Sequence, residues 1–192
     1  MDVNTRNCCH RAFHYWPVTY RDGFTLIELL TVLAIVAITT AIATPALQSF
    51  FTKNYVTSQV NTLLADLNLA RTEAIERNGE VIICASNNGI HCSRSKQWQT
   101  GWIIFSDNND NKKRDDNENL IRIQTPFKGL NNLQFRATYI KFNSIGFSNN
   151  GTFTLCSGNP NYNRAIIIAR TGRARLSDTM VNGDPINCNN YS

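Results

Sequence analysis

The sequence of 192 residues has little of what enzymes use for chemistry. Of its three histidines, His10 and His14 lie in the first 14 residues, which leaves His91 alone in the rest of the chain. We find no C-x-x-C spacing, no G-x-S-x-G turn, no glycine-rich phosphate loop and no carboxylate pair spaced for acid–base catalysis. Apolar residues make up 42% and charged residues only 17%, which is typical of neither a disordered chain nor a coiled coil. The sequence therefore predicts a protein that is not an enzyme and that uses no cofactor.

The chain is long enough for a single medium-sized domain plus an appendage. Its most prominent feature is one long apolar run. Residues 29–52 carry no charge, and Glu28 is the one ionisable residue between Phe24 and Phe51. At about 1.5 Å per residue, a helix of this length crosses a hydrocarbon core of roughly 30 Å. A signal peptide ending at Ala41-Ile42-Ala43 and a plain membrane anchor are two interpretations, but neither explains a carboxylate near the start of a spanning helix. Positive charges before the run place the N-terminus in the cytoplasm: Arg6, Arg11 and Arg21.

The residues around Glu28 resemble a known processing site. The string Gly23-Phe24-Thr25-Leu26-Ile27-Glu28, followed by the apolar run, is similar to the N-terminal motif of type IV pilins and type II secretion pseudopilins. The resemblance implies that a prepilin peptidase removes residues 1–23 and methylates the new N-terminus at Phe24. It also implies that Glu28 pairs with the N-terminal amine of a neighbouring subunit during assembly, which gives the buried carboxylate a cation. Pro45 matches the family as a kink in the long helix.

Beyond the apolar run, the pattern predicts more helix and then strands. Apolar residues recur at steps of three and four over residues 53–78, so the helix would run from Phe24 to about Asn78, with Gly79 as its stop. Eight short β-rich runs follow, separated by Asn, Gly and Ser turns: 80–85, 101–106, 119–124, 133–137, 139–143, 152–156, 164–170 and 173–177. Runs without intervening helices indicate an antiparallel sheet. The prediction is an α+β protein of the type IV pilin-like fold, with a transmembrane or filament-core helix over 24–52 and a head over 53–192.

Four cysteines lie beyond residue 23, and they allow three disulfide pairings. Export of the head favours their oxidation. We favour Cys84–Cys92, which closes a short loop like that of a hairpin, and Cys156–Cys188, which ties the irregular C-terminal tail to a strand. Redox catalysis is the less favoured alternative, because the C-x-x-C spacing is missing.

The stretch Asp107–Glu118 places oxygen ligands at five of the positions that an EF-hand calcium loop uses. Lys112, however, occupies the sixth position, where the sharp turn of an EF-hand requires glycine. Three consecutive cations would also lie beside the ion, and the flanking segments have the pattern of strands. We therefore interpret the stretch as a solvated loop between two strands and predict no metal site.

Positive charge is concentrated in the last third of the chain. Residues 122–192 contain eight cations and two carboxylates, a net charge of +6, whereas residues 24–121 carry a net charge of −2. Four of the cations lie within twelve residues: Arg164, Arg170, Arg173 and Arg175. A strand, a turn at Thr171-Gly172 with free backbone N–H groups, and a second strand would project Arg173 and Arg175 from one face. Such a surface suits the phosphates of a nucleic acid, although a solvated edge strand that resists edge-to-edge pairing explains the same residues.

The head resembles one branch of the pilin family. An export helix, the run Gly101-Trp-Ile-Ile-Phe-Ser-Asp107 before an acidic loop, and a late Gly-Arg-x-Arg are similar to those of FimT/GspH minor pilins and pseudopilins. In FimT-like competence pilins a C-terminal GRxR motif is implicated in binding DNA for natural transformation, and Gly172, Arg173 and Arg175 match that motif. The resemblance implies a minor pilin that binds double-stranded DNA without sequence preference, with Arg170 and Arg164 extending the basic surface.

The same resemblance implies partners and a location. The chain would be a single-pass protein of the inner membrane with its head in the periplasm, and it would then be assembled into an extracellular pilus. Its partners would be the prepilin peptidase, other minor and major pilins, and DNA. The alternative is a structural minor pilin or a type II secretion pseudopilin that primes or caps fibre assembly without binding DNA.

Overall fold

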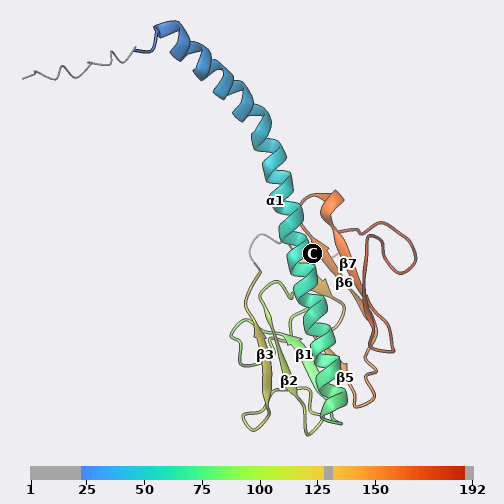
Figure 1. Cartoon of the computed structure of the whole chain (residues 1–192). Coiled ribbons are helices and arrows are strands. Elements are labelled where there is room, and N and C mark those ends of the chain that lie inside the picture. Colours follow the sequence, from blue (N-terminus) through green and yellow to red (C-terminus); the bar gives the residue numbers. More distant parts are fainter. Residues whose placement is uncertain (1–22, 128–131, 189–192) are drawn as a thin grey trace, which may run out of the picture. The chain divides into compact units, whose positions relative to one another are not determined.

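The computed structural model describes residues 23–127 and 132–188 of the chain. Residues 1–22 of the expected leader, with Arg6, Arg11 and Arg21, lie outside the described residues. The chain divides into two compact parts, one ending at Thr44 and the other beginning at Pro45. Helix α1 (Leu26–Glu76) contributes to both parts (Figure 1). The helix predicted from Phe24 to about Asn78 is therefore confirmed to within two residues at each end.

In the part that ends at Thr44, α1 is apolar and exposed along its length. Its large side chains include Leu26, Leu29 and Leu33, and each of them is more than half exposed. By length and composition the helix is sufficient to cross a membrane. Removing apolar surface from water contributes about 25 cal/mol per Å², so this surface favours lipid, or the apolar helices of other subunits, over water.

In the part that begins at Pro45, one face of α1 is buried. The residues of the predicted apolar stripe form this face: Val56, Val60, Leu63, Leu67, Ala70 and Ala74. Beyond Glu76 the chain turns in a Schellman motif, in which the Gly79 N–H donates to the Ala74 carbonyl at 3.1 Å. The left-handed residue of this motif is Asn78, with a φ of 49°. The left-handed residue that ends the helix is therefore Asn78, one residue before the glycine that the sequence indicated, because asparagine also tolerates this conformation.

Eight strands follow in two four-stranded antiparallel sheets (Figure 1). The first sheet has the order β3-β2-β1-β5, with β1 at Val81–Ala85, β2 at Trp102–Ser106, β3 at Leu120–Gln124 and β5 at Tyr139–Phe142. The second has the order β4-β6-β7-β8, with β4 at Asn132–Phe135, β6 at Gly151–Cys156, β7 at Arg164–Ile168 and β8 at Ala174–Ser177. A short 3-10 helix, η1 (Pro160–Tyr162), precedes β7. Each strand overlaps one of the predicted runs, so the α+β class and the antiparallel pairing are confirmed.

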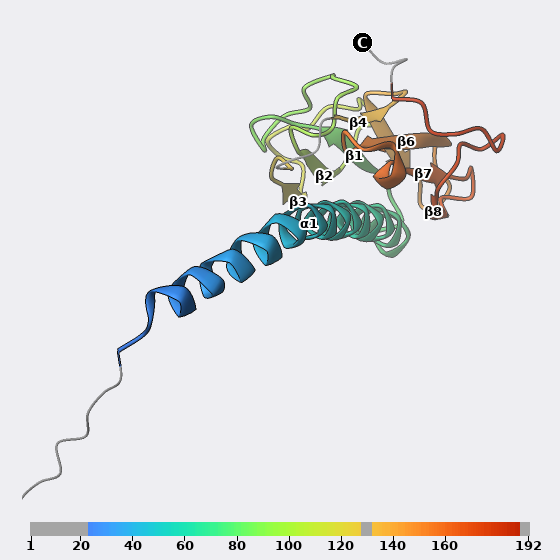
Figure 2. The ribbon, with the colours of Figure 1, turned by 90° about the horizontal axis from the view of Figure 1, so that it is seen from above.

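The main hydrophobic core lies between α1 and the inner faces of the two sheets (Figure 2). Alternate strand residues point into this core, among them Val81 and Ile83 of β1 and Ile166 of β7. The intervening residues Ile82 and Cys84 belong to a second cluster on the opposite face of the first sheet. The strands β1 and β2 are therefore buried on both faces, which explains why their sequences are continuously apolar.

Two disulfides join parts of the head that lie apart in the sequence. Cys84 of β1 bonds to Cys92 in the loop that follows it, and Cys156 at the end of β6 bonds to Cys188 in the C-terminal tail. These are the two bonds that the sequence favoured among the three possible pairings. The second bond anchors the tail that follows β8 to the second sheet.

A buried carboxylate links α1 to the first sheet. Asp66 is fully buried, and its Oδ2 accepts a hydrogen bond from Trp102 Nε1 of β2 at 2.8 Å. Its Oδ1 lies 2.9 Å from Arg122 Nε of β3. Burial raises the pKa of Asp66 above its ordinary value of 3.8, and the Trp102 hydrogen bond and the Arg122 charge offset part of that rise. The carboxylate thus connects the helix to two neighbouring strands at once.

Candidate functional site

The basic string, which we define as the four arginines Arg164, Arg170, Arg173 and Arg175, lies on β7, β8 and the turn that joins them. The two strands pair antiparallel, with Ile167 opposite Arg175. The turn is closed by a hydrogen bond from the Gly172 N–H to the Ala169 carbonyl at 2.9 Å, and Arg170 lies inside it. The strand, turn and strand that the sequence predicted are therefore present.

Gly172 is required for the shape of this turn rather than as a donor to a ligand. Its φ of +75° lies in the left-handed region, which favours glycine. The residue is buried, and a Cβ at this position would collide with the carbonyl oxygen of Gly146. The sequence predicted free backbone N–H groups at this turn, and for Gly172 this is wrong, because its N–H is already bonded within the turn.

The turn is fastened to the segment between β5 and β6. The Ser148 N–H donates to the Arg170 carbonyl at 3.0 Å, and the Ser148 hydroxyl donates to the Ala169 carbonyl at 3.3 Å. Arg71 of α1 donates from Nε to the Gly146 carbonyl at 3.1 Å, which is the oxygen beneath Gly172. These contacts hold the backbone of the turn in place without using the side chains of its own arginines.

Three arginines at this turn and at the start of β8 are exposed: Arg170, Arg173 and Arg175. Within residues 23–127 and 132–188, none of their guanidinium groups forms an ion pair with a carboxylate. A guanidinium group without an internal partner can bind a carboxylate or phosphate from outside through two parallel hydrogen bonds. Three such groups close together in the chain also create a local positive potential.

Arg164 has a different environment from these three arginines. Its Nε lies 3.2 Å from Asp178 Oδ1, and its Nη1 donates to the Asn163 carbonyl at 2.7 Å. Ile167, three residues further along β7, lies opposite Arg175, so about 10 Å of strand separates the two arginines. The structure therefore does not bring Arg164 together with the rest of the basic string.

One arginine outside residues 164–175, which local sequence pattern did not indicate, borders the same surface. Arg136, which follows β4, lies with Arg170 and Arg175 around a hollow of about 500 Å³ on the outer face of the second sheet. Arg173 does not border this hollow. The spacing of residues in the sequence could not indicate Arg136, because its position relative to β8 depends on the order of strands in the second sheet, where β6 and β7 lie between β4 and β8. The one signal that includes it is the excess of cations in the last third of the chain.

The acidic segment between β2 and β3 binds its own backbone. The Asp107 carboxylate accepts hydrogen bonds from two backbone N–H groups of the loop, at 3.2 and 3.0 Å. The Glu118 carboxylate accepts two others, at 2.9 and 3.0 Å. These residues are the first and last positions of the EF-hand-like pattern, and here they stabilise a loop between two strands.

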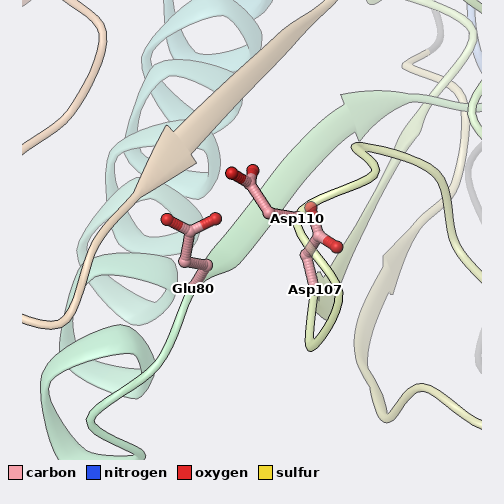
Figure 3. Close-up of side chains that lie close together, drawn as sticks. All are labelled: Glu80, Asp107 and Asp110. Atoms are coloured by element: carbon pink, nitrogen blue, oxygen red, sulfur yellow. The ribbon is translucent and has the colours of Figure 1, made fainter.

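Glu80, Asp107 and Asp110 lie close together beside this loop, with one carboxylate oxygen of each within 4.8 Å of the others (Figure 3). The Lys141 ammonium lies 2.6 Å from Glu80 and 2.9 Å from Asp110. Hydrogen bonds from Lys141 and then Lys112 lower the pKa of Asp110 to about 2. Lysine thus supplies the positive charge beside these carboxylates, and a divalent cation would have to displace it.

The residues of the expected processing site lie at the start of α1. Gly23 and Phe24 precede the helix, and Glu28 lies in its first turn, where a negative charge interacts favourably with the helix dipole. The Glu28 N–H donates to the Thr25 hydroxyl at 3.3 Å, in the manner of an N-cap. Pro45 lies inside α1 and has no N–H to donate to the carbonyl four residues before it.

Two families of known proteins match the sequence. Residues 59–172 match the family described as type II transport protein GspH, and residues 19–44 match the prokaryotic N-terminal methylation motif. One relative, the prepilin peptidase-dependent protein D of Escherichia coli strain K12, is 37% identical over 68 residues. These residues cover 35% of this chain and 47% of the relative, so the match spans about half the length of that protein.

Two crystal structures of the type IV minor pilin FimU from Pseudomonas aeruginosa strain PAO1 have a similar fold. The structure in space group P21 has a TM-score of 0.54 and 21% identity, and the match covers 67% of this chain and 92% of that one. The structure in space group P65 has a TM-score of 0.50 and 22% identity, with coverages of 63% and 91%. At this identity the likeness concerns the fold, which is a long helix packed on antiparallel sheets.

Proposed function

We propose that this chain, which belongs to the GspH family of type II transport proteins and has the fold of a type IV minor pilin, binds double-stranded DNA. The residues that would bind the DNA are Arg173 and Arg175. Its family and fold are those of pilin-like subunits, which are structural proteins rather than enzymes. The proposed role is that of a minor pilin that captures DNA for uptake in natural transformation.

The observation that supports DNA binding is the set of exposed arginines at and just after the turn between β7 and β8, which form no ion pair within the described parts of the chain. Arg170, Arg173 and Arg175 are exposed, whereas Arg164 and Arg122 pair with carboxylates of the head. The turn itself is held by hydrogen bonds of its backbone, so the arginine side chains are free to bind phosphates of a DNA backbone.

Binding of this kind reads the phosphates and not the base edges, so it has little sequence preference. Non-specific DNA binding typically has a dissociation constant of roughly 10⁻⁴ to 10⁻⁶ M. A single head would therefore bind weakly, and several subunits or sister pilins in one fibre would raise the overall affinity by acting together.

The proposal includes processing and assembly. A prepilin peptidase would cut after Gly23 and methylate Phe24, and Glu28 would pair with the amine of a neighbouring subunit. The methylation motif over residues 19–44 supports this step. The exposed apolar helix is consistent with an anchor in the inner membrane before assembly and with a place in the pilus core afterwards. Other minor and major pilins would be the partners in the fibre.

The test is a titration of the processed chain, in a non-ionic detergent, with a short DNA duplex at several salt concentrations. Each phosphate contact contributes about 0.9 to the log–log salt slope, so Arg173→Gln/Arg175→Gln should lower that slope by about 1.8. At 0.1 M salt this corresponds to roughly 60-fold weaker binding. The control, Lys53→Gln/Lys113→Gln, removes the same charge from α1 and the acidic loop and should bind like the unmodified chain. An unchanged titration for the arginine variant would contradict the site.

The second candidate is a pseudopilin or structural minor pilin that does not bind DNA. The description of the matched family as a type II transport protein favours it. This candidate predicts no binding of the unmodified chain to DNA, even at low salt and high protein concentration. It also predicts contacts between heads in the fibre, which chemical cross-linking of assembled pilins would detect whether or not DNA is added.

A further inference from the structure

The outer face of the second sheet carries a hollow of about 500 Å³, which is within the size range of ligand sites in proteins. Its floor includes Ile167 of β7, whose neighbours Ile166 and Ile168 point the other way, into the core. In the tail that follows β8, Met180 and Val181 form one wall. The hollow therefore lies between the sheet and the C-terminal tail.

The tail is held in a defined position over the sheet. A bridge pairs Thr179 with Pro185, and the Met180 N–H donates to the Asp184 carbonyl at 2.9 Å, so the tail folds back on itself. The Cys156–Cys188 disulfide then anchors the tail, at Cys188, to β6. The apolar wall of the hollow is consequently part of the fold.

Three arginines from three different elements border this hollow. Arg136 comes from the segment after β4, Arg170 from the turn before β8, and Arg175 from β8 itself. The residues that line the hollow include no aspartate and no glutamate. In the described parts of the chain none of the three forms an ion pair, so the positive charge at this place is uncompensated.

Arg136 is positioned before any ligand arrives. Its Nη2 donates to the Asn150 carbonyl at 2.6 Å. Gly151 leaves room for this arrangement, because a Cβ there would lie 2.5 Å from the Phe135 ring and 3.4 Å from Arg136 Nε. A side chain that is already ordered loses less conformational entropy on binding than a free one.

We propose that this hollow binds a further phosphate of the DNA held by Arg173 and Arg175, and that Arg136 is a binding residue outside the Gly172–Arg175 motif. The phosphate would lie among the three guanidinium groups, and the deoxyribose next to it would contact Met180 and Val181. The inference rests on the proposed function. It extends the DNA contact from the turn across the outer face of the second sheet.

The first test is Arg136→Gln in the same salt-series titration. Loss of one phosphate contact should lower the log–log slope by about 0.9, which is roughly eightfold weaker binding at 0.1 M salt. Arg136→Lys keeps the charge and should retain most of the slope. Lys53→Gln removes one charge from α1 and should leave the slope unchanged. Circular dichroism of each variant should show the same melting temperature as the unmodified chain, because Arg136 lies at the surface.

A second test does not alter any arginine. Val181 is 66% exposed, so Val181→Asp should fold normally while placing a carboxylate at the wall of the hollow. It should weaken DNA binding by at least as much as Arg136→Gln, because the carboxylate repels the phosphate and competes for the guanidinium groups. The matched control is Ile90→Asp, at a residue 49% exposed in the loop after β1, and it should bind like the unmodified chain.

The outcomes separate this inference from the function on which it rests. If the unmodified chain does not bind DNA, the proposed function fails and the inference fails with it. If the unmodified chain binds and Arg173→Gln/Arg175→Gln loses binding, the function stands. In that case a slope for both Arg136→Gln and Val181→Asp equal to that of the unmodified chain would overturn the inference alone.

Discussion

Replacing Gly172 with alanine should destabilise the head far more than the same replacement at Gly183. Both glycines have a positive φ, +75° at Gly172 and +87° at Gly183, so each substitution places an L-residue in the left-handed region at about 1–2 kcal/mol. At Gly183 no atom lies within 4 Å of the added Cβ. At Gly172 the Cβ would collide with the backbone carbonyl of Gly146, which cannot rotate away as a flexible side chain would.

Overpacking of this kind adds about 1–3 kcal/mol, so we expect a loss of about 2–5 kcal/mol for Gly172→Ala and about 1–2 kcal/mol for Gly183→Ala. For a head of this size, 1 kcal/mol corresponds to about 2–4 °C in melting temperature. Circular dichroism of the processed chain in detergent should therefore give a loss of about 10 °C for Gly172→Ala and about 4 °C for Gly183→Ala. Equal losses would refute the argument that the turn must dock against Gly146.

Two further predictions concern the contacts that hold the head together. Arg122→Gln removes the cation beside Asp66 and should destabilise the head by about 1–2 kcal/mol at pH 7. The pKa of Asp66 is raised in the folded state, so the unfavourable contribution of its ionised carboxylate to folding stability grows as pH rises through that pKa. Urea unfolding should therefore show that Arg122→Gln lowers the free energy of unfolding more at pH 7 than at pH 4. A decrease that is the same at both pH values would contradict this. Cys156→Ser/Cys188→Ser opens a loop with a sequence separation of 32 residues and should cost about 3–4 kcal/mol. A melting temperature unchanged in that variant would show that the tail is held by its other contacts.

The elements of the fold were predictable from the sequence because each has a local signal. The β-rich runs alternate with Asn, Gly and Ser turns, and the stripe from Val56 to Ala74 has the period of a helix. The division of the strands into two sheets has no such signal. It depends on pairings between distant segments, such as β1 with β5, which only the folded chain brings together.

The basic site was only partly predictable for the same reason. Arg173 directly follows a glycine in the sequence and Arg175 lies two residues further on, so a turn followed by a strand at these arginines was predictable from local pattern. Arg164 belongs to the same string, but its ion pair with Asp178 depends on how the segment after β8 folds back. Arg136 borders the hollow because of the order of strands in the second sheet, and local sequence pattern does not determine that order. The spacing of oxygen ligands over Asp107–Glu118 is likewise local and similar to that of an EF-hand loop. It does not indicate that Lys141, from the distant strand β5, lies beside Glu80 and Asp110.

The most direct measurement of the central claim is hydrogen–deuterium exchange of the processed chain with and without a saturating DNA duplex. DNA binding at the arginine turn predicts slower exchange in peptides that cover residues 169–181, and little change in the acidic loop over residues 107–118. Protection confined to the acidic loop or to α1, or no protection anywhere at saturating DNA, would contradict the claim that this turn binds DNA.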